Sequence, residues 1–487
     1  MHGEELVPAW VPPPSTDSVD QPEVEVLVEC SPELPQATLD AVTGFHSVVS
    51  VSASSQAIVS TDEDDTTPSP PMDIVCILDV SGSMSSDNKL NNLKCAVNFM
   101  RDELKDNDRM SVITFERSAT RIHGLLKMTP ANKSRTEAYI NDLCPGGGTR
   151  ILSGLQEAFQ VLQSRQSRNP ISSVFLLTDG IDASDLREKK KIAKEIKEMG
   201  ASLFVYGFGN DHDSQHLKTI ADAGEGTFAF IEKSDMVIDA FGGALGAEKS
   251  IFAQNLCLTL SAASGAVITN VHAGSYRKVI DPTGTSAKVY FPNLMQGEQR
   301  DVLLMMNLPS VAEPEDNHTI VTTALDYGRI EGGEKVDMIG QPSVISRVSK
   351  IDPNLERDNN VDVQVNRALL ESSTAASLAL ADQGKYENAR ANLDSTLNKI
   401  KSSSSCQRQD AKTVAFVSEI EATIGNLRDA NVYRCGGGRS MMTEMASNIN
   451  QQRCTYTKTG RSDAYQNCAS LGLQAKTQSK KAKFFNK

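Results

Sequence analysis

The chain has 487 residues, enough for two to four domains, and 39% of them are hydrophobic, as is usual in globular proteins. The formal net charge of −13 at pH 7 argues against nucleic acid as the main partner, because an acidic surface repels the phosphate backbone. No stretch predicts a membrane span or a secretory signal, and the nine cysteines contain no C-x-x-C pair, so we expect a cytoplasmic protein whose thiols are mostly free.

The first 71 residues predict little structure of their own. Residues 1–22 are polar and proline-rich, which predicts disorder. Within residues 23–60, the apolar stretches 24–28 and 45–51 predict two strands, too few to form a domain. Residues 61–71 (TDEDDTTPSPP) predict a linker, whose acidic side chains we expect to be solvated rather than bound to a metal.

The stretch DIVCILDVSGSM, residues 73–84, predicts a buried strand that ends in polar side chains. Its apolar run stops at Asp79, and Ser81 and Ser83 follow in D-x-S-x-S spacing. Residues 88–100 then carry apolar side chains at helical spacing. The loop therefore lies between the carboxyl end of a strand and the start of a helix, where open α/β sheets bind ligands.

Two later stretches supply further oxygen atoms. Thr149 follows three glycines and precedes a helical pattern, and Asp179 follows a second buried strand, SVFLLT. Asp, Ser and Thr offer hard oxygen ligands, which suit Mg²⁺, Mn²⁺ or Ca²⁺. The alternative, that the serines only cap a helix, explains neither carboxylate. The predicted metal ligands are Asp79, Ser81, Ser83, Thr149 and Asp179.

Strand and helix patterns alternate along residues 72–247, which predicts an α/β domain with a doubly wound, mostly parallel sheet. Residues 250–350 contain strand patterns without helices and predict an antiparallel β-sandwich. We expect the strands within residues 23–60 to pair with this sandwich, so that the α/β domain is inserted into it. Residues 359–451 predict a C-terminal α-helical region, with a helix pair that Gly384 interrupts, and residues 455–487 predict a basic, disordered tail.

The motifs DVSGSM, GGGT and TDG, in this order and spacing, resemble the metal-ion-dependent adhesion site of the von Willebrand factor A (VWA) domain. The resemblance covers roughly residues 71–246 and implies a Rossmann-like fold. It also implies that Ser81, Ser83 and Thr149 coordinate the ion directly, while Asp79 and Asp179 act mainly through bound water. Each of the five positions matches the family motif without a substitution.

The segments YGFGNDHD, GTFAFIE and GEQRDVLLMMNLP resemble a narrower group, the plant-type ubiquitin ligases that combine a VWA domain with a RING domain. Those ligases carry zinc-binding cysteines ahead of the VWA domain. Only Cys30 precedes it in this chain. We therefore do not expect ligase activity to carry over from the resemblance.

The sequence favours a binding function over catalysis. Two carboxylates leave a divalent ion electrophilic, so it can accept an Asp or Glu carboxylate from a protein partner. A Mg²⁺-dependent hydrolase is one alternative, but no Ser/His/Asp set or Cys/His pair is recognisable, and we expect no enzyme. The other alternative is a scaffold that binds through its helical region and keeps the metal site for structure only.

Overall fold

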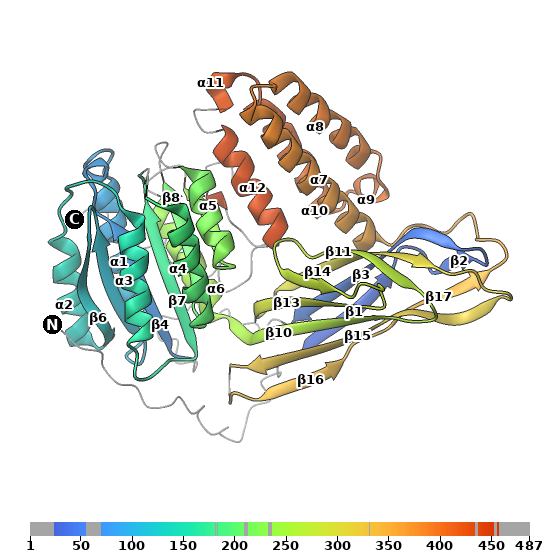
Figure 1. Ribbon diagram of the computed structural model, residues 1–487, viewed down its shortest axis with the longest axis horizontal. Coiled ribbons are helices and arrows are strands. Elements are labelled where there is room, and N and C mark those ends of the chain that lie inside the picture. Colours follow the sequence, from blue (N-terminus) through green and yellow to red (C-terminus); the bar gives the residue numbers. More distant parts are fainter. Residues whose placement is uncertain are drawn as a thin grey trace.

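A computed structural model describes residues 24–54, 70–180, 182, 184–208, 213–231, 236–330, 332–433, 437–451 and 455–456. The segment 1–22 predicted to be disordered lies outside the described residues, as do most of the linker 61–71 and nearly all of the tail 455–487. Figure 1 shows three parts: an α/β domain (residues 70–249), a β-sandwich and a helical region. The predicted fold class is confirmed.

A seven-stranded sheet forms the centre of the α/β domain, in the order β18-β9-β8-β7-β4-β5-β6. Neighbouring strands are parallel except β5 and β6, which are antiparallel. Every residue of β4 and β7 is buried, as their continuous apolar runs predict. The strands are β4 (Met72–Asp79), β5 (Arg109–Phe115), β6 (Ala119–Lys127), β7 (Ile171–Thr178), β8 (Ser202–Phe208), β9 (Thr227–Ile231) and β18 (Thr455–Tyr456).

Helices cover both faces of this sheet, so each face has its own apolar core. On one face Leu93 and Phe241 pack against Cys76 and Phe175, and on the other Leu155 packs with Ile77. The first face carries α1 (Lys89–Glu103), α2 (Pro130–Asn141) and α6 (Val237–Lys249); the second carries α3 (Ile151–Gln163), α4 (Leu186–Glu198) and α5 (Ser214–Ala223).

The β-sandwich combines strands from before and after the α/β domain. One sheet has the order β1-β3-β14-β11, in which β3 pairs with β14, for example Val49 with Val302. The other has the order β12-β13-β10-β15-β17-β2, with β16 beside β15. The strands are β1 (Val26–Pro32), β2 (Gln36–Thr38), β3 (Val42–Ala53), β10 (Ile251–Ala262), β11 (Val267–His272), β12 (Arg277–Ile280), β13 (Ser286–Met295), β14 (Gln299–Leu308), β15 (Glu315–Arg329), β16 (Lys335–Ile339) and β17 (Ser343–Val348).

The helical region packs around a core that includes Leu370, Leu393 and Phe416. Gly384, with φ of +77°, forms the turn between its first two helices, where a left-handed residue is needed. The helices are α7 (Asn359–Asp382), α8 (Tyr386–Lys401), α9 (Ser404–Gln407), α10 (Ala411–Asn426), α11 (Ala430–Val432) and α12 (Gly438–Asn450). No described helix has both the length and the apolar character needed to cross a membrane.

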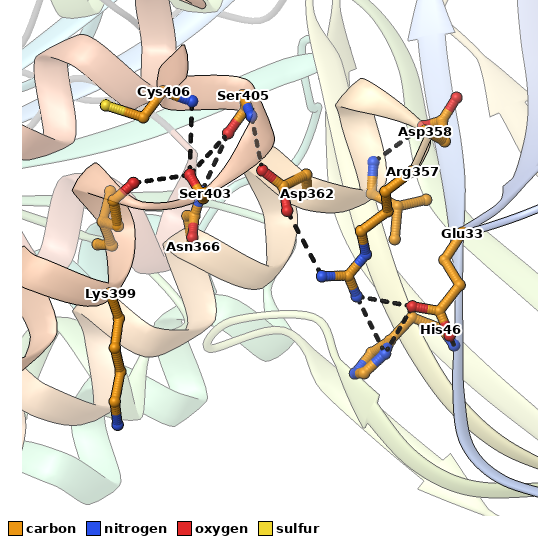
Figure 2. A network of polar contacts seen from close by, with 12 residues as sticks. Glu33, His46, Arg357, Asp358, Asp362, Asn366, Lys399, Ser403, Ser405 and Cys406 are labelled. Carbon is orange, nitrogen blue, oxygen red and sulfur yellow. Dashed lines mark hydrogen bonds and ion pairs between the residues drawn. The ribbon is translucent and has the colours of Figure 1, made fainter. Parts of the chain in front are cut away.

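A polar network joins the helical region to the sandwich (Figure 2). The guanidinium of Arg357 lies 2.7 Å from Glu33 Oε2 and 3.4 Å from Asp362 Oδ1, and also contacts His46 of β3. The other oxygen of Asp362 accepts a hydrogen bond from the backbone N–H of Ser405. One arginine thus connects the end of β1 with the first helix of the helical region.

The second contact between these parts centres on Asp301 of β14, whose side chain is buried. Its carboxylate accepts hydrogen bonds from Ser50 Oγ at 2.6 Å and Gln364 Nε2 at 2.8 Å. Its backbone N–H and C=O both bond to the side chain of Gln451, directly after α12. Since α12 also contacts α5 and β9, it touches all three parts of the molecule (Figure 1).

Candidate metal centre

The predicted ligands lie on three loops at the carboxyl edge of the sheet. Asp79 is the last residue of β4, and Asp179 directly follows β7, the parallel neighbour of β4. Ser81 and Ser83 follow Asp79 in a short 3-10 turn, and Thr149 precedes α3. Because parallel strands end at one edge, their terminal side chains are brought together.

Hydrogen bonds connect four of the five residues directly. Ser83 Oγ donates to Asp179 Oδ1 at 2.8 Å and lies 3.0 Å from Ser81 Oγ. Asp79 Oδ1 accepts from the backbone N–H of Ser81 at 2.8 Å. Its Oδ2 accepts from the hydroxyl of Thr178 at 2.5 Å. The two serines therefore bridge the two carboxylates.

The fifth residue, Thr149, lies against the backbone after Asp179. A Cβ built on Gly180 would lie 2.8 Å from Thr149 Oγ1, so only glycine leaves room for this hydroxyl. Two backbone hydrogen bonds, Gly82 N–H to Gly147 O and Gly146 N–H to Val80 O, hold the Thr149 loop beside the D-x-S-x-S turn. All five predicted residues thus lie on adjacent loops at one edge of the sheet, and the side chain of Ser83 is exposed.

The two carboxylates have different electrostatic surroundings. Asp79 has no exposed surface and is bound only by neutral groups. Burial raises its pKa to about 6 and the charge of Asp179 adds to the rise, against the hydrogen bonds from Ser81 and Thr178. Asp179 instead has a cation beside it, since the Lys89 ammonium donates to its Oδ2 at 2.6 Å. Both partners of this ion pair are buried.

Lys89 and Thr178 are the site residues that the sequence reasoning missed. Thr178 is the last residue of a mostly apolar strand, and its position in the sequence does not distinguish it from the rest of that strand. Lys89 is the first residue of α1, where a lysine is normally solvated. The one available signal is the Asp87-Asn88 pair ahead of it, residues that tolerate a left-handed turn.

The donor set fits a hard divalent ion. It offers two carboxylates and three hydroxyls, and Gly180 leaves the space that the Thr149 hydroxyl occupies. Among the described residues, no group of three or more His, Cys, Asp and Glu side chains is placed to hold a metal. The five predicted residues offer neither the thiolate nor the imidazole that softer ions favour.

The comparisons with known proteins agree with this reading of the domain. Residues 73–241 match the family model of the von Willebrand factor type A domain. The chain is 27% identical over 248 residues to WAV3, an E3 ubiquitin-protein ligase of Arabidopsis thaliana, covering 50% of this chain and 32% of the ligase. It is 24% identical over 307 residues to an uncharacterised protein of Synechocystis, covering 62% of this chain and 70% of that protein.

A solved structure shares the whole arrangement. The structure of a von Willebrand factor type A protein from Catenulispora acidiphila matches with a TM-score of 0.63 at 17% identity, covering 90% of this chain and 99% of that one. The likeness at this identity concerns the fold. The α/β domain is therefore a VWA domain, a type that in general serves as a metal-dependent protein-interaction module.

Proposed function

We propose that this chain is a metal-dependent protein-binding module in which a divalent ion, Mg²⁺ inside cells, joins the VWA domain to an acidic side chain of a partner. The observation that supports it most is the network formed by Asp79, Ser81, Ser83 and Asp179, with Thr149 beside it. Ser81, Ser83 and Thr149 would hold the ion, and the two aspartates would orient its waters. A partner Asp or Glu would complete the coordination from the side on which Ser83 is exposed.

Each residue of the site has a task that needs no chemical step. Thr178 fixes the orientation of the Asp79 carboxylate, and Ser83 fixes that of Asp179. The bound ion supplies a Lewis-acidic centre for an anionic ligand. The ubiquitin ligase activity of the plant relatives is not part of the proposal, because the match to WAV3 covers 32% of its length.

Direct ion binding is the first test. Calorimetry with Mn²⁺ should show binding by the wild type and none by a Ser81→Ala/Ser83→Ala double variant. Ser85→Ala is the matched control, because its hydroxyl bonds to the Gly82 carbonyl on the same turn but lies outside the network. Equal Mn²⁺ binding by the wild type and the double variant would contradict the proposal.

Removing the ion tests whether partner binding depends on it while folding of the domain does not. The apolar cores on both faces of the sheet need no ion, since each buried side chain contributes roughly 1.5–3 kcal/mol. An ion at ten times its Kd adds only about 1.4 kcal/mol by mass action. EDTA should therefore lower the melting temperature by only a few degrees, yet abolish capture of Asp- and Glu-containing peptides from an array, with Asn and Gln peptides as controls. Undiminished capture in EDTA would favour a scaffold acting through its helical region.

A further inference from the structure

The buried ammonium of Lys89 places a cation of the chain's own inside the candidate metal site. Lys89 Nζ lies 2.6 Å from Asp179 Oδ2, and the exposed fractions of the two side chains are 5% and 0%. The other oxygen of Asp179 accepts from Ser83 Oγ. The lysine and the serine therefore occupy the two oxygens of one carboxylate.

The local backbone brings Lys89 to this position in an unusual way. Asp87 and Asn88 have φ of 51° and 57°, so two consecutive non-glycine residues adopt the left-handed conformation. Lys89 then begins α1, and a cation at a helix N-terminus is opposed by the helix dipole. Burial of an ammonium is also unfavourable unless it is paired. Three local costs thus accompany a single ion pair, and strained turns of this kind are found at functional sites.

The formal charge of the site follows from its members. Asp79 and Asp179 contribute two negative charges and Lys89 one positive charge, which leaves −1 for the protein. On the neighbouring loops Glu116 lies beside Gly147 and Arg117 beside Gly148, and these opposite charges offset each other. A divalent ion would bring the combined charge of these three described side chains and the ion to +1, which favours the approach of an anion.

We propose that Lys89 is an internal counter-ion that weakens binding of the free ion and couples firm binding to an anionic partner. This rests on the proposed function and specifies its partner as a carboxylate-bearing segment. Without a partner, the ion and Lys89 repel each other across Asp179. A partner carboxylate supplies the missing negative charge. By linkage, the ion raises carboxylate affinity by the same factor as the carboxylate raises ion affinity.

The test is a Mn²⁺ titration of the full chain, with free Mn²⁺ measured by electron paramagnetic resonance, in chloride and in acetate at equal ionic strength. Acetate is the carboxylate probe. Wild type should bind Mn²⁺ more tightly in acetate. Lys89→Met should bind Mn²⁺ at least tenfold more tightly than wild type in chloride, with a smaller gain from acetate. Lys94→Met is the matched control on the same helix, because its ammonium bonds to the Asn141 carbonyl instead.

Several outcomes would overturn the inference. A folded Lys89→Met variant that binds Mn²⁺ no more tightly than wild type would show that Lys89 only supports the loop. If that variant does not fold, the wild type alone tests the inference. Equal Mn²⁺ affinity of the wild type in chloride and in acetate would show that ion binding and carboxylate binding are not coupled. Failure of the proposed function looks different, because the wild type would then bind no Mn²⁺ in either salt.

Discussion

The two ends of strand β4 carry two buried aspartates with opposite roles. Asp73, at the start, accepts hydrogen bonds from Arg109 at 2.8 and 2.9 Å and from Arg165 at 3.0 Å. Asp79, at the end, accepts hydrogen bonds from Ser81 and from the Thr178 hydroxyl, which are neutral groups. Neither side chain has exposed surface.

The difference lies in which atoms balance the charge. At the first end, two arginines of the chain form ion pairs with Asp73, so its negative charge is balanced within the fold and the cluster contributes to structure. At the second end, neutral groups surround Asp79, and burial raises its pKa to about 6. A buried carboxylate without a cation is unfavourable for folding, and such groups gather at functional sites. One strand thus separates an acid paired within the fold from an acid of the proposed metal site.

The largest expected effect is a difference in stability between two variants, in each of which one of these aspartates is replaced by asparagine. Asp73→Asn leaves Arg109 and Arg165 buried without a full counter-charge and should reduce the free energy of unfolding by about 3–5 kcal/mol. Asp79→Asn should change it by less than about 1 kcal/mol in EDTA, and should abolish Mn²⁺ binding. Urea denaturation and calorimetry of both variants would measure this. Equal destabilisation by the two would contradict the comparison.

Glu248 at the end of α6 offers an intermediate case. Burial raises its pKa to about 7, against hydrogen bonds from Ser173 and Ser202, and its Oε1 has no hydrogen-bond partner in the described part of the chain. The folded state therefore keeps a proton that the unfolded state releases between about pH 4.5 and 7, so stability falls as pH rises through this window. Glu248→Gln should be more stable than wild type by about 2 kcal/mol at pH 8.

Thermal denaturation at two pH values measures this effect. The advantage of Glu248→Gln should shrink toward zero at pH 4.5, where wild-type Glu248 is protonated in the folded state. Glu188→Gln, which replaces an exposed acid on α4, is the control measured at the same two pH values. If Glu248→Gln differs from the wild type in stability by the same amount at both pH values, the charge of Glu248 is not the cause of that difference.

The smallest effect concerns the hydroxyl that orients Asp79. Thr178→Val removes the donor to Asp79 Oδ2 and should weaken Mn²⁺ binding by about 1 kcal/mol, or roughly fivefold, with little change in stability. Thr114→Val, near the end of β5 on the other side of β4, is the control. Unchanged Mn²⁺ affinity in Thr178→Val would show that the orientation of Asp79 does not matter for the ion.

The elements near the site could be predicted because their signals are local. Each of β4 and β7 contains a continuous apolar run, and a carboxylate lies at or directly after the end of the strand. Strand β6 was missed because it is a sheet edge whose first residues are mostly exposed and polar. Strand β18 was missed because two residues carry no periodicity. Its pairing with β9 depends on the tertiary fold.

Other differences arise in the sandwich and in the loop before α1. The strand pattern near the end of residues 250–350 is divided into two strands, β16 and β17, around Gly340 and Pro342. The sandwich is antiparallel, as expected, apart from the short strand β2 from before the VWA domain, which pairs in parallel with β17. The burial of Lys89 depends on the backbone of Asp87 and Asn88, which sequence patterns do not specify.

The position of β3 between β1 and β14 affects how the chain is made on the ribosome. Val49 emerges early, but its partner Val302 is synthesised only after the whole VWA domain. The VWA domain can therefore fold while the hairpin of β1 and β3 still exposes an unpaired edge, a state open to association with other chains. A nascent chain released at any point before β14 would leave that edge uncovered permanently.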